Sequence, residues 1–74
     1  MGNKVVLGKY EHYKHKLYEV IGVAKHSETL VEFVVYRALY GSHDLWIRPK
    51  DMFMENVEID GEMVPRFKLI QKYR

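Results

Sequence analysis

The sequence predicts an all-β domain: a small, SH3-like, partly open barrel of five to six short strands, with one helical turn near residues 49–53. Three observations lead to this fold class. Runs of β-branched and aromatic residues recur roughly every 8–12 residues. Clusters of Gly, Pro, Asp and Ser separate these runs, as turns do. The 74 residues are enough for one domain, 1–74. Its core should be modest, because so short a chain buries only about 60% of the surface that it exposes when unfolded.

The first third of the chain is expected to hold two strands. Lys4–Leu7 has the composition of a short strand that Gly8 ends, and a polar segment with a turn at Lys14–His15 follows. Over Leu17–Lys25, apolar and β-branched residues occupy both sets of alternating positions, which predicts a strand buried on much of both faces. Gly22 in the middle of this strand predicts a bulge.

Residues 30–40 are open to two interpretations. Thr29 and Glu32 match a capping box and Gly41 suits a helix C-cap, so a helix over Leu30–Tyr40 is one of them. The run Phe33–Tyr36 consists of strand formers, and the polar residues before it suit a hairpin loop. We therefore predict a strand. Its two faces would carry Phe33, Val35, Arg37 and Leu39 on one side and Val34, Tyr36, Ala38 and Tyr40 on the other.

The segment after this strand predicts a turn, a strand and a helical turn in close succession. Gly41–Asp44 is a turn by composition. Leu45–Arg48 is a short strand that Pro49 ends, because proline cannot donate to a ladder. Pro49–Phe53 predicts one turn of helix, since proline is favoured at the first helical position. We expect Met52 and Phe53 to fill the core beneath this turn.

The last part of the chain predicts a hairpin and one further strand. Asp60–Gly61, between Val57–Ile59 and Met63–Val64, is the strongest hairpin signal in the sequence. Pro65 limits the second arm of the hairpin to a sheet edge. Arg66–Ile70 alternates basic and apolar residues and predicts a last short strand.

The composition predicts a cytoplasmic, globular protein. Hydrophobic residues make up 47% of the chain and charged residues 30%, which is typical of a folded domain rather than a disordered one. Cysteine is absent, so neither disulfides nor thiolate metal sites hold the fold together. The apolar run near the start is too short for a signal peptide, and no stretch approaches the roughly 18 apolar residues of a membrane span. We expect no membrane association and no cofactor.

The net charge of +2 is small but unevenly distributed. Basic residues gather towards the two ends of the chain, at Lys4, Lys9, Lys14, Lys16, Arg66, Lys68, Lys72 and Arg74. An acidic block lies between them, at Asp51, Glu55, Glu58, Asp60 and Glu62. If the two ends lie together, they form one basic face that favours a polyanion. The alternative, which we favour, is that they are solvated tails flanking a neutral domain.

Several motifs, taken in their combined spacing, resemble one protein family. They are Tyr10-x-His12-Tyr13-Lys14, Tyr18-x-Val20, Ala24-x-His26-Ser27-Glu28, Val34-Val35-Tyr36-x-x-Leu39-Tyr40-Gly41, Trp46-x-Arg48-Pro49-x-x-Met52-Phe53 and Asp60-Gly61…Val64-Pro65-Arg66-Phe67. They cover most of residues 8–70. The chain resembles a family of small, uncharacterised bacterial proteins classed only as a domain of unknown function. His15 stands where a turn glycine of this family is expected, which leaves the turn type there open. The resemblance implies a compact β-rich domain and no established activity.

The histidines suggest two kinds of chemistry, neither of which we predict. His12, His26 and His43, with Glu28, are candidate metal ligands, but no H-x-H or H-x-x-x-H spacing preorganises them. His26 beside Ser27 suggests a base and a nucleophile, but adjacent side chains at a strand end point in opposite directions. Ser27 and Glu28 are better explained as groups that satisfy backbone donors in a loop. We expect no metal site and no catalytic residues, and the sequence favours a protein that is not an enzyme.

The candidate ligand-binding residues are aromatic, histidine and arginine side chains. They are His12, Tyr13, His26, Tyr36, Tyr40, Trp46 and Arg48. Aromatic rings stack on planar ligands, arginine recognises phosphate or carboxylate, and a histidine of near-neutral pKa exchanges a proton with its ligand. His12 and His26 would line one pocket if the first segment folds over the central hairpin. The alternative roles are structural: surface or loop positions for the histidines, and for Arg48 an ion pair with Glu28, Glu32 or Asp51.

The leading interpretation is a non-enzymatic binding module with an aromatic, histidine and arginine face. Its ligand would be anionic or planar: a nucleotide, RNA or a peptide. One alternative is a protein-interaction or homo-oligomerising module that uses an exposed sheet edge and apolar surface. The other is a small hydrolase-like or accessory domain with His12, His26 and Glu28 as its acid–base groups.

Overall fold

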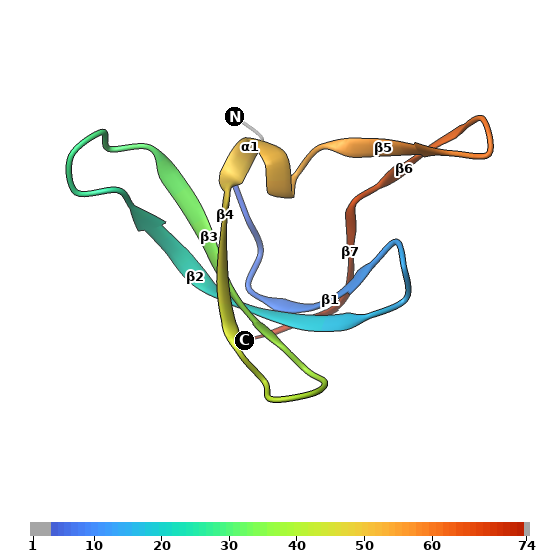
Figure 1. Cartoon of the computed structure of the whole chain (residues 1–74), viewed down its shortest axis with the longest axis horizontal. Coiled ribbons are helices and arrows are strands. Elements are labelled where there is room, and N and C mark those ends of the chain that lie inside the picture. Colours follow the sequence, from blue (N-terminus) through green and yellow to red (C-terminus); the bar gives the residue numbers. More distant parts are fainter. Residues whose placement is uncertain (1–3, 74) are drawn as a thin grey trace.

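The computed structural model describes residues 4–73, which form two antiparallel sheets and one short helix (Figure 1). The elements are β1 (Gly8–His12), β2 (Leu17–Lys25), β3 (Glu32–Ala38), β4 (Leu45–Pro49), α1 (Lys50–Phe53), β5 (Asn56–Ile59), β6 (Glu62–Pro65) and β7 (Phe67–Lys72). Five strands make one sheet in the order β4-β3-β2-β1-β7, and β5 and β6 make a separate hairpin. The all-β prediction is confirmed, with seven strands rather than five or six. The sheets do not close into a barrel, since β4 and β7 remain edge strands.

The first strand begins later than the sequence predicts. Lys4–Leu7 is not a strand, and Gly8 begins β1 instead of ending a strand before it. β1 pairs with β2 on one side and with β7 on the other. A glycine is required at this point, because a Cβ on Gly8 would meet the backbone oxygen of Gln71 in β7. The residues before β1 serve the core as coil: Val5 packs against it, and the Tyr10 hydroxyl donates to the Val6 carbonyl oxygen at 2.6 Å.

The long hairpin of β2 and β3 confirms the strand interpretation of residues 30–40. The predicted faces of β3 are confirmed as well, since Val34, Tyr36 and Ala38 are buried. A register shift between Val20 and Gly22 is the bulge that Gly22 predicts. The prediction that β2 is buried on both faces is wrong. Val20 is buried, but Ile21 is 45% exposed, because the described part of the chain provides no layer over the outer face of the sheet.

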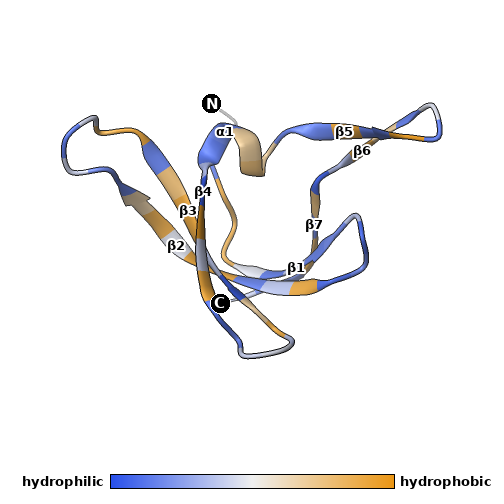
Figure 2. Cartoon of the chain, in the orientation of Figure 1, coloured by the Kyte–Doolittle hydropathy of each residue, from blue (hydrophilic) through white to orange (hydrophobic). Residues whose placement is uncertain are grey.

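The elements after β4 follow their sequence signals closely. Pro49 ends β4 and is the N-cap of α1, which is a single turn. The β5–β6 hairpin turns at Asp60 and Gly61, whose φ angles of 50° and 83° are those of a type I′ turn. β7 begins one residue later than predicted and extends to Lys72. Figure 2 shows hydrophobic residues along the central strands β2 and β3 and mostly hydrophilic residues at the tips of the hairpins.

Aromatic rings dominate the core. Its buried residues are Tyr10, Val20, Val34, Tyr36, Phe53 and Phe67. Phe53 stacks on Phe67 with ring centroids 4.2 Å apart and an interplanar angle of 9°. The turn of α1 thus places one large ring under the sheet. Only half of the expected Met52–Phe53 plug is buried, because Met52 points outward and is 45% exposed.

The two basic ends of the chain meet, but their charges are mixed with acids. β1 and β7 are neighbours, which places Lys9 opposite Gln71 and Glu11 opposite Lys68. Arg66 is bound to Glu55 at 2.9 Å. Arg74 lies outside the described residues. Within residues 4–73, no helix is long and apolar enough to cross a membrane.

Candidate functional site

Five polar side chains gather on the inner face of the large sheet, the face that carries the core. We call them the aromatic–arginine surface: His12, Tyr18, Tyr36, Tyr40 and Arg48. Strands β1, β2, β3 and β4 supply one residue each, and Tyr40 follows β3. The Tyr18 ring lies in the middle of the group, with its centroid 5.4 Å from that of Tyr36, 5.5 Å from that of Tyr40 and 6.3 Å from that of His12. Four of the seven predicted ligand-binding residues therefore lie close together, although the Tyr36 side chain is largely buried in the core beneath the others.

Tyr18 is the member of this surface that sequence reasoning missed. Its hydroxyl and that of Tyr40 share a hydrogen bond of 2.6 Å. Burial and this hydrogen bond both raise the pKa of Tyr18, so the phenol stays protonated. Tyr18 shares a face of β2 with the buried Val20, two residues along the strand, but its place beside Tyr36 depends on the register of β2 against β3. The sequence contains the alternation but not that register.

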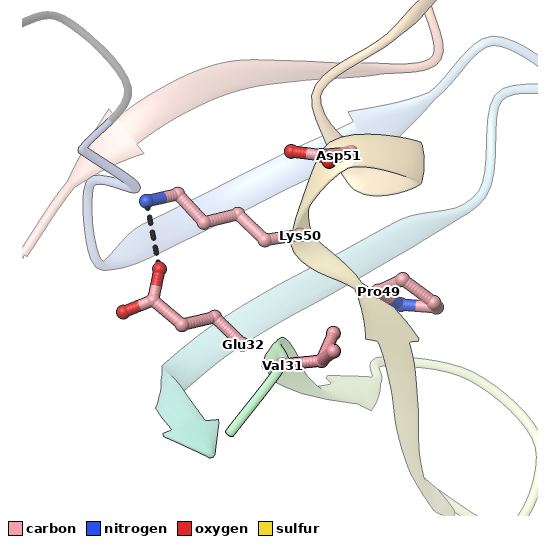
Figure 3. Close-up of a pocket in the computed structure, with 5 residues that line it drawn as sticks. All are labelled: Val31, Glu32, Pro49, Lys50 and Asp51. Carbon is pink, nitrogen blue, oxygen red and sulfur yellow. Dashed lines mark hydrogen bonds and ion pairs between the residues drawn. The ribbon is translucent and has the colours of Figure 1, made fainter. Parts of the chain in front are cut away.

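Arg48 is the cation of the aromatic–arginine surface. Its Nε donates to the Tyr36 hydroxyl at 3.3 Å, and its guanidinium carbon lies 5.8 Å from the centroid of the Phe67 ring. The predicted structural role, an ion pair with Glu28, Glu32 or Asp51, is not found. Glu32 instead accepts from the Lys50 ammonium at 3.1 Å (Figure 3). Among the ion pairs of residues 4–73, none involves Arg48.

His12 lies where positive charges converge. Partial burial lowers its pKa, and the charges of Arg48, Arg66 and Lys14 lower it further. Its Nδ1 accepts a hydrogen bond from the Lys14 backbone N–H at 3.1 Å, which leaves Nε2 as the proton-bearing nitrogen of the neutral ring. The imidazole packs between Tyr13 and Phe67, with ring centroids at 4.4 and 4.9 Å. An anion bound here would reverse the electrostatic part of the pKa shift.

Lysines line the margin of the same surface. The Lys16 ammonium lies 4.9 Å from the centroid of the Tyr40 ring, and the Lys14 ammonium lies 5.9 Å from that of Tyr13. Arg66 is nearby and bound to Glu55, yet its Nε is buried without a hydrogen-bond partner. The margin therefore adds the positive charges of Lys14 and Lys16 beside the aromatic–arginine surface.

A groove of about 550 Å³ continues from His12 towards the β5–β6 hairpin. The β1–β2 hairpin and the β5–β6 hairpin border this groove, and both project to the same side of the molecule in Figure 1. One wall comes from the end of β1 and the turn after it, and the other from β5, β6 and β7. The lining residues are Glu11, His12, Tyr13, His15, Ile59, Asp60, Glu62, Val64, Pro65 and Lys68. This groove brings the predicted Tyr13 close to the aromatic–arginine surface, with acidic groups on the far wall.

The structure separates His26 from the other candidates. It lies in the loop between β2 and β3, where its Nδ1 accepts from the backbone N–H groups of Glu28 and Thr29 at 3.1 and 3.3 Å. The nine residues of β2 separate His26 from His12. At roughly 3.3 Å per residue, a strand of this length spans about 30 Å. The expected pocket with both histidines does not form. His26 instead organises its own loop.

Trp46 lies at the rim rather than in the site. It pairs with Tyr36 across the β3–β4 ladder and is 50% exposed on the edge strand. In residues 4–73 no set of three or more His, Cys, Asp or Glu side chains is arranged to hold a metal ion. A smaller hollow of about 380 Å³, lined by Val31, Pro49 and Asp51 with the Lys50–Glu32 pair (Figure 3), lies at α1.

The lowered pKa of His12 predicts a loss of stability in weak acid. The unfolded chain has the ordinary histidine pKa near 6.5, so below that pH it takes up a proton that the folded state resists. The contribution of His12 to the free energy of unfolding is therefore complete above about pH 6.5. It decreases as the pH drops towards the pKa that His12 has in the folded state. Urea unfolding at pH 7.5 and 5.5 should show a smaller change in His12→Gln than in the unmodified protein. His43→Asn, in the exposed turn before β4, is the control. Equal changes in all three proteins would contradict the role of His12.

Comparison with known proteins identifies relatives but no ligand. The model of a family described as "Protein of unknown function (DUF1653)" matches residues 8–69. A crystal structure of a DUF1653 protein from Bordetella bronchiseptica is similar over 100% of this chain and 97% of its own, with a TM-score of 0.86 and 28% sequence identity. No curated protein matches the chain. The family resemblance seen in the sequence motifs is thereby confirmed.

Proposed function

Because this chain belongs to the DUF1653 family, whose description assigns no function, we propose its function from the site itself. The aromatic–arginine surface is the binding site of a non-enzymatic module, and its ligand is a small anion that carries a planar ring. Mononucleotides and short single-stranded RNA are the representative ligands of that chemistry.

One observation carries this proposal: Arg48 has no carboxylate partner among the described residues, although it is partly buried. A guanidinium that is removed from water is normally compensated by a carboxylate or phosphate. Its neighbours Tyr36 and Phe67 offer a hydroxyl oxygen and a ring face, neither of which carries a negative charge. A bound anion supplies the missing charge.

The remaining groups suit an anion joined to a ring. Arg48 contributes its terminal N–H groups and His12 its Nε2–H, both of which donate to phosphate oxygens. Tyr40 is 40% exposed, and stacking of a base on such a ring contributes about 1–3 kcal/mol. Lys16, above the Tyr40 ring, adds a second positive charge at the margin.

Charge on the neighbouring hairpin favours a small ligand over a long polyanion. Asp60 and Glu62 line the far wall of the groove that begins at His12. A phosphate backbone that continued along the groove would meet these carboxylates, and like charges repel. A mononucleotide or a strand of a few residues avoids them.

Of the two alternative functions, the structure supports one and not the other. The acid–base alternative loses its support, because His26 and Glu28 lie in the loop at the opposite end of β2 from His12. The protein-interaction alternative gains support from the exposed edge strand β4, where Leu45, Trp46 and Ile47 are all at least half exposed.

Replacement of Arg48 tests the proposed function. We expect Arg48→Gln to weaken the binding of AMP and of inorganic phosphate at least about tenfold, because a charge-assisted hydrogen bond contributes roughly 1.5–3 kcal/mol. Isothermal titration calorimetry at low ionic strength measures this, with NMR shift mapping to locate the bound ligand.

Arg37→Gln is the matched control for that experiment. Arg37 lies on the opposite face of the sheet, and its guanidinium donates to the His43 carbonyl oxygen at 2.9 Å. Its loss should leave binding unchanged. Equal affinity of the Arg48 and Arg37 variants, or shifts that avoid His12, Tyr18 and Tyr40, would show that the aromatic–arginine surface is not the site.

A further inference from the structure

The edge strand β4 leaves one side of its backbone without a partner in residues 4–73. Its other side pairs with β3, with Tyr36 opposite Trp46 and Val35 opposite Ile47. The Ala38 N–H donates to the Asp44 carbonyl oxygen at 3.0 Å. Hydrogen-bonded pairs alternate along an antiparallel ladder, so the backbone groups of Trp46 and Arg48 also face β3. Those of Leu45 and Ile47 therefore face away from the sheet.

We propose that β4 pairs with β4 of a second copy of this chain, antiparallel and about a two-fold axis that passes by Trp46. This pairing makes a closed, symmetric dimer through one continuous sheet. The dimer does not depend on the proposed anion site, although both involve Arg48 at the end of β4.

The backbone hydrogen bonds favour this register over the one whose two-fold axis passes by Ile47. With the axis at Trp46, Leu45 lies opposite Ile47 of the partner subunit, and the reverse pair forms by symmetry. Each pair exchanges two hydrogen bonds, so every outward N–H and C=O of Leu45 and Ile47 is satisfied. An axis at Ile47 would instead set Leu45 opposite Pro49 of the partner subunit, and proline has no N–H to donate.

The side chains of β4 are complementary in the same register. Leu45 and Ile47, 53% and 63% exposed, would meet on the outer face, and Trp46 would meet Trp46 of the partner subunit on the inner face. Asp44 and Arg48 stand at equal distances from Trp46 in the sequence. Antiparallel pairing therefore places Asp44 opposite Arg48 of the partner subunit, so the charges at the two ends of the interface are opposite in sign.

Exposure of apolar residues on a sheet edge supports the same conclusion. Edge strands of monomeric proteins are usually short, charged or covered, because a free apolar edge invites pairing with another chain. β4 is short but carries three consecutive apolar residues, and it has neither lysine nor a bulge within Leu45–Ile47. The small net charge of +2 opposes self-association only weakly.

Sedimentation velocity from about 5 μM to 1 mM, together with amide hydrogen exchange at both limits, tests the proposal. The mass should rise towards twice 8.9 kDa, and the Leu45 and Ile47 amides should become protected only at high concentration. The Trp46 amide should be protected throughout. A monomer at 1 mM, or a dimer in which the Leu45 and Ile47 amides still exchange freely, would overturn the proposal.

Two variants identify the edge that pairs. Ile47→Pro removes an outward N–H without touching the ladder to β3, and should weaken the dimer about tenfold or more, because it removes one bond from each half of the symmetric interface. Ile70→Lys alters the opposite edge strand β7, where Ile70 is also exposed, and should leave the dimer intact. The reverse outcome would assign the interface to β7. Circular dichroism of each variant shows whether it remains folded, and the exchange pattern of the unmodified protein decides the question independently.

Discussion

Phe53→Ala should lose about 3–5 kcal/mol of unfolding free energy, the largest effect expected of any single substitution in the core. Phe53 is 2% exposed. Its ring stacks on Phe67, has an edge contact with Tyr10 at a centroid distance of 5.4 Å and a tilted contact with Tyr36 at 5.6 Å. Removing the ring leaves a cavity among three other aromatic residues that strands hold in place and that cannot easily collapse into it. A domain of this size has roughly 4–11 kcal/mol of stability in total, so this loss is a large share of the whole.

Met52→Ala is the control for that substitution. The two residues are adjacent on the single turn of α1, but Met52 is exposed. Its replacement should change stability by less than about 0.5 kcal/mol. Urea unfolding monitored by circular dichroism gives both values. Similar losses in the two variants would mean that α1 contributes through its helical turn rather than through the Phe53 ring.

Gly8→Ala should be the most damaging change outside the aromatic core. Gly8 is buried at the start of β1, where β1 pairs with both β2 and β7. The new methyl group would meet the Gln71 carbonyl oxygen and, at 3.1 Å, the Cα of Lys72. Both are backbone atoms, so β7 would have to move away from β1. We expect a loss of about 2–3 kcal/mol, with faster amide exchange along β7.

Gly22→Ala distinguishes this steric effect from a general effect of glycine replacement. Gly22 also lies within a strand, but a Cβ there meets no atom within 4 Å. This variant should be neutral or slightly more stable, because alanine restricts the unfolded chain more than glycine does. If both variants lose stability equally, the approach of β7 is not the reason that residue 8 is glycine.

Local signals in the sequence predicted most of the fold. The Asp60–Gly61 hairpin, the turn of α1 after Pro49 and the bulge at Gly22 each depend on backbone conformation over a few residues, and all three are confirmed. The role of Gly8 could not be predicted from its neighbours in the sequence. The local pattern predicts that Gly8 ends a strand, whereas its function is to allow the close approach of β7, some sixty residues later in the chain. No pattern near residue 8 contains that information.

The candidate site was predictable by residue type but not by position. Aromatic, histidine and arginine residues do gather, because alternation along β3 placed Tyr36 on the inner face as expected. The separation of His12 from His26 follows from the length of β2 and the order of the strands. Tyr18 joins the site through cross-strand register. Both are properties of the assembled sheet, and neither can be inferred from the spacing of residues in a short motif.

The position of Trp46 determines what its fluorescence can report. It is the single tryptophan of the chain and is already half exposed in the folded state. Unfolding therefore changes its surroundings little, and its emission is a poor measure of stability. The same exposure makes it a sensitive probe of what happens at the edge of the sheet. Tryptophan emission should follow contacts made by β4, while circular dichroism follows the fold, so one sample yields two independent signals.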